Sequence, residues 1–264
     1  MAAGNELERL LTWQMGNGAF AFTTTRQGGV STGNHASFNI NSYCGDQPQS
    51  VESNRKALCK ALGIDLRRLV MPHQTHGTEV ADIDEDFLAL DESGRRERLE
   101  GVDALTTDMK KVCIGVSTAD CTPIIIYDPV GKVAAAVHAG WRGTVGRIAQ
   151  KAVEHLQKHY GARPCDMTAV VGPCISARHF EVGDEVFEAF QKAGFPMESI
   201  AHRREKWHID LKGCNVLQLT EAGVPKKNIT VSELCTWRDN DLLFSARRQG
   251  TACGRLFTGI IITG

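Results

Sequence analysis

The sequence has 264 residues, of which 42% are hydrophobic and 23% charged, and its formal net charge is −1. These proportions are typical of a globular protein, and the scattered Lys and Arg argue against a nucleic-acid-binding surface. No stretch reaches the roughly 18 consecutive apolar residues of a membrane span, and Gly16 and Gly18 interrupt any apolar signal-peptide core. We therefore expect a soluble, cytoplasmic protein.

Strand-like runs rich in Val and Ile occur between helix-like segments. The expected elements, in chain order, are a strand over 20–25, a helix over 51–62, strands over 112–117, 123–127 and 133–137, a helix over 145–159, a strand over 168–171, helices over 182–193 and 211–222, and a strand over 259–263. Their irregular order favours an α+β fold, a layered α/β sandwich with mixed sheets. Dinucleotide-binding and P-loop motifs are missing from the sequence.

The composition changes clearly in only one segment, residues 84–100, which is charged and mixed in sign. Because such a run is typical of solvated surface, we interpret it as an excursion and not as a domain boundary. We expect a single catalytic domain over residues 1–264.

The nine cysteines form an odd set without a Cys-x-x-Cys pair: Cys44, Cys59, Cys113, Cys121, Cys165, Cys174, Cys214, Cys235 and Cys253. This pattern argues against a disulfide framework and against a zinc ribbon. We expect free thiols in a reducing cytosol, and a chemical role for any one of them needs a specific argument.

Two of the strand-like runs end in reactive residues. One runs into Cys121 and the other into His138, 17 positions later, and a short hairpin-like segment joins them. Adjacent antiparallel strands would bring these residues together, with His76 of the Gln-Thr-His-Gly segment as a third member. Such a trio could bind zinc with one position open, or use Cys as a nucleophile and His as a base. Spacing alone is a weak signal, because a Cys and a His near strand ends are more often packing or loop residues.

A series of motifs accompanies these residues in order along the chain. They are Thr24–Ser31, Phe38–Ile40, Gly45-Asp46, Asn54-Arg55, Gln74–Gly77, Thr118–Pro123, His138–Gly143, Gly172–Ile175, Cys235-Thr236, Phe244-Ser245 and Gly254-Arg255. Together they resemble the YfiH family of laccase-domain proteins. This family includes FAMIN-like purine nucleoside phosphorylases and was formerly described as multicopper polyphenol oxidases. The similarity extends from about residue 20 to the C-terminus.

The resemblance implies a function and a metal site. It implies a YfiH-like fold and zinc ligation by His76, Cys121 and His138, which would also be catalytic, whereas His73 lies outside the matched motif. The implied reactions are phosphorolysis of adenosine, inosine, guanosine and methylthioadenosine, and deamination of adenosine. The partners would then be small molecules, a purine nucleoside and phosphate. The family more often has an aromatic residue where this chain has Ala246.

These reactions need further groups around the metal. Deamination needs a proton donor or acceptor, for which Asp120 is a candidate. Phosphorolysis needs an anion site, and Arg26, beside Gly28, and Arg142, just before an expected helix, could provide it. Three more residues, Asn39, Asn41 and Arg55, could position ribose or phosphate, although local turn bonding and capping remain equally open for them.

Two alternative functions come from other classes of protein. Copper-dependent polyphenol oxidation needs several His-x-His pairs, and the sequence contains none, so we expect zinc and not copper. The second alternative is a metal-free hydrolase or amidase acting on cell-wall precursors, with Cys121 as nucleophile and His138 as base.

Overall fold

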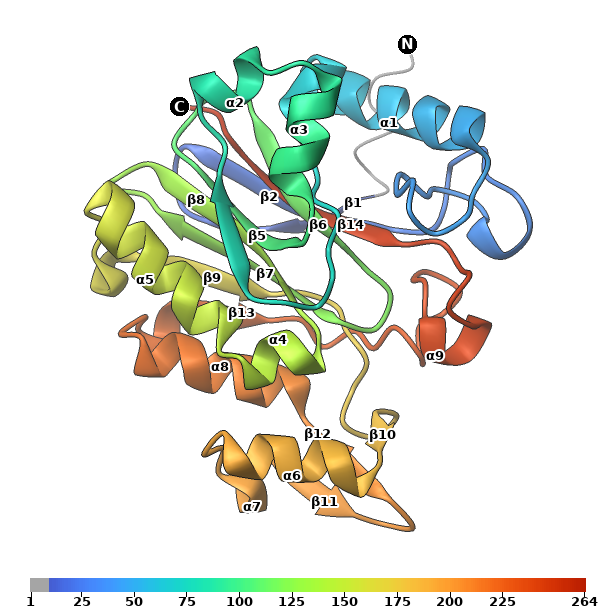
Figure 1. Ribbon diagram of the computed structural model, residues 1–264, viewed down its shortest axis with the longest axis vertical. Helices are drawn as coiled ribbons and strands as arrows, with labels where there is room; N and C mark the ends of the chain where they lie inside the picture. Colours follow the sequence, from blue (N-terminus) through green and yellow to red (C-terminus); the bar gives the residue numbers. More distant parts are fainter. Residues whose placement is uncertain (1–9) are drawn as a thin grey trace.

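Two β-sheets stack face to face and helices cover both outer faces in the computed structural model, which describes residues 10–264 (Figure 1). The five-stranded sheet has the order β1 (Leu10–Trp13), β2 (Ala19–Thr24), β14 (Leu256–Ile262), β6 (Cys113–Thr118) and β3 (Leu69–Val70). The six-stranded sheet has the order β13 (Ile229–Val231), β9 (Thr168–Val171), β7 (Thr122–Asp128), β8 (Val133–Ala139), β5 (Val102–Thr107) and β4 (Glu79–Asp82). Both sheets contain parallel and antiparallel pairs.

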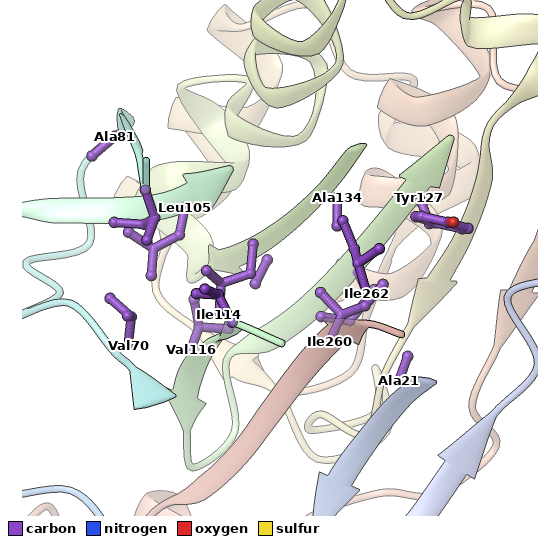
Figure 2. Packing of buried hydrophobic residues seen from close by; sticks show 14 of the residues in the cluster. Ala21, Val70, Ala81, Leu105, Ile114, Val116, Tyr127, Ala134, Ile260 and Ile262 are labelled. Carbon is purple, nitrogen blue, oxygen red and sulfur yellow. The ribbon is translucent and has the colours of Figure 1, made fainter. Parts of the chain in front are cut away.

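The main hydrophobic core lies between the two sheets (Figure 2). Ile114 of β6 and Ile260 of β14 contribute from one sheet, and Leu105 of β5 and Tyr127 of β7 contribute from the other. All four side chains are fully buried. Every residue of β5, β6, β7, β8 and β14 is buried, which explains their nearly continuous apolar runs.

Helices bury the outer faces of the sheets. Helix α1 (Pro48–Leu62) places Leu58 against Phe22 and Phe257 of the five-stranded sheet. Helices α5 (Ile148–Tyr160) and α8 (Leu211–Glu221) cover the six-stranded sheet, where Leu156 and Leu219 join its apolar side chains. Both α1 and α5 end at a glycine with positive φ, Gly63 and Gly161, which permits the left-handed cap.

A small lobe extends from one end of the sandwich (Figure 1). It contains a three-stranded sheet of β10 (Glu181–Val182), β12 (Trp207–Ile209) and β11 (Ala201–Arg203), with α6 (Asp184–Lys192) and α7 (Met197–Ile200). Phe190, Phe195 and Ile209 lie in its own core. Leu211 and Cys214 of α8 belong to the same cluster, so the lobe packs on the main sandwich through this helix.

The predicted fold class is confirmed, and every expected strand is present, that over 168–171 with the same ends and the others with shifted ends. The expected helix over 145–159 is wrong in one respect. It is broken into α4 (Trp141–Val145) and α5 by Gly146 and by Arg147, whose φ is +63°. The expected helix over 182–193 begins later, because residues 181–182 pair as β10 and α6 starts at Asp184.

The charged stretch over 84–100 forms two short helices, α2 (Glu85–Ala89) and α3 (Glu92–Leu99). Phe87 of α2 is buried against the main core, while most of the charged side chains face solvent. A final short helix, α9 (Ala246–Gln249), precedes β14. None of the helices in the described part of the chain has the length and apolar character to cross a bilayer.

Candidate metal centre

The β7–β8 hairpin brings Cys121 and His138 to the same end of the six-stranded sheet. In the antiparallel register Pro123 pairs with His138 and Thr122 pairs with Ala139. Cys121 directly precedes Thr122, so its side chain lies beside the last residues of β8. The predicted proximity of these two residues is confirmed.

His76 reaches the same place from the loop between β3 and β4. Its backbone has a φ of +64°, an uncommon conformation for a residue other than glycine. The buried carboxylate of Asp103 on β5 holds this loop, because it accepts hydrogen bonds from the backbone N–H groups of Thr75 (3.2 Å), His76 (3.0 Å) and Gly77 (2.6 Å). Strain at His76 is thus offset by a buried anchor.

Asp103 also orients His138. Its Oδ1 lies 2.7 Å from Nδ1 of His138, and both side chains are almost fully buried. A carboxylate on Nδ1 leaves Nε2 free to bind a metal, as in the carboxylate–histidine arrangement of many metal sites. One buried carboxylate thus orders both histidines.

One ligand atom from each of His76, Cys121 and His138 lies within 4.8 Å of the other two. The two imidazole rings meet edge to face at 74°. Gly140 makes this approach possible, since a Cβ there would lie 2.8 Å from Cδ2 of His76 and 3.1 Å from Sγ of Cys121.

The electrostatics favour a thiolate. Burial disfavours the charged form of Cys121, but the charge of His138 and hydrogen bonds from both histidines outweigh it and lower the thiol pKa to about 6. Burial likewise opposes the charge on His138, yet Cys121 and Asp103 raise the pKa of this imidazole to about 9. Burial also opposes ionisation of Asp103, but the hydrogen bond and charge of His138 lower its pKa overall. These shifts describe a thiolate beside an imidazolium.

The donor set fits a metal ion. Two imidazoles and one thiolate lie close enough together to bind one ion, and zinc sites with three protein ligands leave a fourth position for water or substrate. His76 is exposed and Cys121 is half-buried, so that position opens towards solvent.

The group lies in a cleft of about 570 Å³. Its other lining residues are Ala119, Asp120, Ile175, Phe180, Ala246, Arg247, Thr251 and Arg255. Apolar side chains and two arginines thus face the candidate ligands. Ala246 lies among them.

Asp120 lies beside the candidate ligands and has a φ of +93°. Its Oδ1 accepts hydrogen bonds from the hydroxyls of Thr236 (2.5 Å) and Ser245 (2.7 Å), and its Oδ2 accepts one from the N–H of Arg247 (2.6 Å). These contacts fasten α9 and its neighbours to the cleft. A role of Asp120 in proton transfer stays a prediction.

The predicted arginines lie elsewhere. Arg26 donates hydrogen bonds to the carbonyls of Ala36 and Asn240, and Arg55 donates one to the carbonyl of Ile40. Arg142 is exposed and lies over the Trp141 ring. None of the three arginines is among the residues that line the cleft, so their part in substrate binding stays a prediction.

The two predicted asparagines lie behind the cleft. Asn39 is fully buried and its Oδ1 accepts the N–H of Arg255 at 3.1 Å. Asn41 donates to Oγ of Ser117 at 2.6 Å, and the backbone N–H of Ser117 donates to Gln74 in the loop that carries His76. Both amides thus support residues of the cleft, and contact with ribose or phosphate stays a prediction.

Three residues of the centre were missed at the sequence level. Asp103 had a signal, a single acidic residue inside the strand-like run Val102–Thr107, but no strand was expected there. Arg255 lies in a matched motif without an assigned role, and Arg247 follows Ala246 directly.

The fold and the centre define a mixed α/β protein with a candidate mononuclear metal site in an open cleft. The family model described as multi-copper polyphenol oxidoreductase laccase matches residues 20–263. The chain therefore belongs to this family, the laccase-like YfiH family, which confirms the resemblance seen in the motifs.

Relatives and solved structures agree over nearly the full length. A purine nucleoside phosphorylase of Bacteroides thetaiotaomicron is 44% identical and covers 91% of this chain and 90% of its own. Adenosine deaminase RL5, from an unknown prokaryotic organism, is 46% identical over 97% and 98%. The crystal structure of Bacillus licheniformis YfiH has a TM-score of 0.90 at 31% identity and covers 97% of each chain. That of YlmD from Geobacillus stearothermophilus has a TM-score of 0.87 at 34% identity, over 94% and 93%.

Proposed function

We propose that this chain is a cytoplasmic, zinc-dependent purine nucleoside phosphorylase that also deaminates adenosine. The observation that carries the proposal is the convergence of two imidazoles and a thiolate in a cleft that two arginines also line. Relatives with these two names match nearly the whole chain, and all nine cysteines are free thiols, as a reducing compartment requires.

In phosphorolysis a phosphate oxygen bonds to C1′ of the ribose while the bond from C1′ to the purine nitrogen breaks. The purine leaves with the electron pair and takes up a proton. Arg247 and Arg255 line the cleft and would hold the phosphate, because guanidinium groups bind its oxygens in pairs. In the structure both guanidinium groups donate to backbone carbonyls, Arg247 to that of Glu181 and Arg255 to that of Thr251. Phe180 and Ile175 offer an apolar surface for the flat purine.

In deamination water adds to C6 of adenosine and ammonia leaves. A zinc ion held by His76, Cys121 and His138 would supply Lewis-acid chemistry and lower the pKa of a water molecule. Asp103 keeps His138 in the tautomer that presents Nε2 to the cleft. Asp120 is our candidate for moving the proton, since it lines the same cleft and directly precedes Cys121.

The test incubates the purified protein with adenosine, with and without phosphate, and follows adenine and inosine while bound metal is measured. We expect phosphate-dependent release of adenine, inosine formation without phosphate, and one zinc ion at this centre. Cys121→Ala should abolish both activities, whereas Cys165→Ala, which removes an exposed free thiol, should change neither. Full activity in Cys121→Ala would contradict the zinc proposal.

One observation favours a second candidate, a metal-independent Cys-His hydrolase. The thiolate of Cys121 lies beside the imidazole of His138, and the carboxylate of Asp103 orients that imidazole. This is the arrangement of a cysteine nucleophile with its base. Chelation separates the two: a phosphorylase that needs zinc loses activity when the metal is removed, whereas a thiol hydrolase acting on cell-wall amides retains it. Alkylation of Cys121 would stop both.

A further inference from the structure

A second group of metal-binding side chains lies at the junction of β4 and α5. We propose that Asp82, His155 and His159 form a binding site for a divalent transition-metal ion, separate from the centre that contains Cys121. One ligand atom from each of the three lies within 4.8 Å of the other two. The inference does not depend on the proposed function.

The two histidines are one helical turn apart on α5, so their side chains extend from the same face. Their rings stack at 4.0 Å with an interplanar angle of 8°. The neighbouring face of α5 is buried on the sheet through Ala152 and Leu156. His155 is half-buried and His159 is exposed, so an ion from solvent can reach them.

Asp82 is held in place by groups around it. Its Oδ1 accepts hydrogen bonds from the hydroxyls of Thr106 (2.6 Å) and Tyr160 (2.7 Å) and lies 2.9 Å from Nε2 of His155. All three contacts are made to Oδ1, and Oδ2 has no hydrogen-bond partner among residues 10–264. Outer contacts of this kind orient a ligating carboxylate. Asp108 acts electrostatically on Tyr160 and adds negative charge nearby.

The donor set selects the class of ion. Two imidazoles and one carboxylate suit Zn²⁺, Ni²⁺, Co²⁺ or Cu²⁺, whereas Mg²⁺ and Ca²⁺ prefer all-oxygen sites. Three protein ligands leave positions for water, and zinc would replace the proton that Nε2 of His155 shares with Asp82.

The site's position gives it a structural role. Asp82 is the last residue of β4, the strand that begins two residues after Gly77 of the loop that carries His76. His155 and His159 belong to α5, which follows β8 and α4 in the chain. A bound ion would therefore fasten α5 to the edge of the six-stranded sheet. Because the ion binds only the folded chain, it stabilises that state.

The test titrates the metal-free full chain with Zn²⁺ by calorimetry, in a His76→Ala, Cys121→Ala background that removes two ligands of the other centre. We expect one Zn²⁺ per chain to remain bound and the melting temperature to rise with Zn²⁺ concentration. Adding His159→Ala should weaken this binding by more than about tenfold, the lower end of the loss from an outer contact alone. Lys158→Ala, an exposed neighbour on α5, should leave it unchanged.

Two results would overturn the proposal: a background variant that folds but binds no Zn²⁺, or residual binding indifferent to His159→Ala. A second measurement applies even if the background variant fails to fold. In the otherwise unchanged chain, His159→Ala should lower the Zn²⁺ stoichiometry from two to one. Co²⁺ should show sulfur-to-metal charge transfer for one of its two sites only, and His159→Ala should remove the site without it. An unchanged stoichiometry counts against the site.

Discussion

Oδ1 of Asp103 lies 2.7 Å from Nδ1 of His138, and Asp103 connects this histidine to the loop that carries His76. The same carboxylate accepts the backbone N–H groups of residues 75–77, which include His76. Two of the three candidate ligands thus depend on one buried residue of β5, a strand that lies beside β8 in the sheet. The sheet therefore positions two of the three candidate ligands through Asp103.

The first prediction follows from this contact. Asp103→Asn keeps the shape of the side chain but replaces one acceptor oxygen with an NH₂ group, which cannot accept both His138 and the loop. We expect the affinity of the centre for zinc to fall by about 10- to 100-fold. Competition with a chromophoric chelator measures it. Asp166→Asn, at an exposed pair with Arg163, serves as the control, and an affinity equal to that of the unmodified chain would exclude the positioning role.

The second prediction concerns Gly140. A methyl group there would lie 2.8 Å from Cδ2 of His76, closer than real Cβ contacts come, and 3.1 Å from Sγ of Cys121, which is tight. Gly140→Ala should therefore displace His76 and weaken zinc binding while the fold persists. Circular dichroism and metal content check both points. Gly94→Ala in α3 has no contact shorter than 3.3 Å and should bind zinc normally.

The sequence predicted the layered α/β architecture and the hairpin that joins Cys121 to His138. It succeeded because strands buried on both faces appear as continuous apolar runs, as over Pro123–Tyr127. The motif around Gln74 then identified His76 as the third member. Apolar runs and short motifs are local in the sequence, so they can be recognised without knowing which distant segments pair.

The rest depended on pairing between distant segments. The strand that carries Asp103 was not expected, although it places that carboxylate beside two ligands. The break between α4 and α5 at Arg147 carries no proline signal. Arg26 was predicted to meet an anion, yet two backbone carbonyls accept its hydrogen bonds. Tertiary contacts decide whether a polar side chain forms hydrogen bonds with backbone carbonyls or with a ligand.

The third prediction uses thiol chemistry. In metal-free protein at neutral pH, Cys121 should react with iodoacetamide faster than Cys174, because its pKa is lowered to about 6 whereas burial raises that of Cys174 to about 12. Zinc should protect Cys121, since ligation occupies Sγ. Mass spectrometry of tryptic peptides measures both rates. Equal labelling of Cys121 with and without zinc would rule out ligation by this thiol.

The fourth prediction concerns the core between the sheets (Figure 2). Leu105 is fully buried there, so Leu105→Ala should lower the free energy of unfolding by about 2–5 kcal/mol through lost contacts and a residual cavity. Val130→Ala, at a side chain that is 71% exposed, should cost far less. Urea denaturation compares them. Similar losses in both variants would show that this cluster is not the main source of stability.

The fifth prediction separates the two proposed reactions. Phosphorolysis needs an anion site and deamination does not, so Arg247→Gln should raise the KM for phosphate and leave inosine formation from adenosine nearly unchanged. Arg247 is exposed and lines the cleft, so its replacement leaves the core intact. Arg248→Gln is the matched control, because Arg248 lies on the same helix but is not among the residues that line the cleft.

Steady-state rates at several phosphate concentrations give the comparison. If Arg247→Gln reduces both reactions equally, the arginine serves the common nucleoside site; if it changes neither, Arg255 is the other arginine that lines the cleft. Only a selective rise in the phosphate KM assigns the anion to Arg247. That result would place phosphate beside α9, on the segment that Asp120 fastens to the candidate ligands.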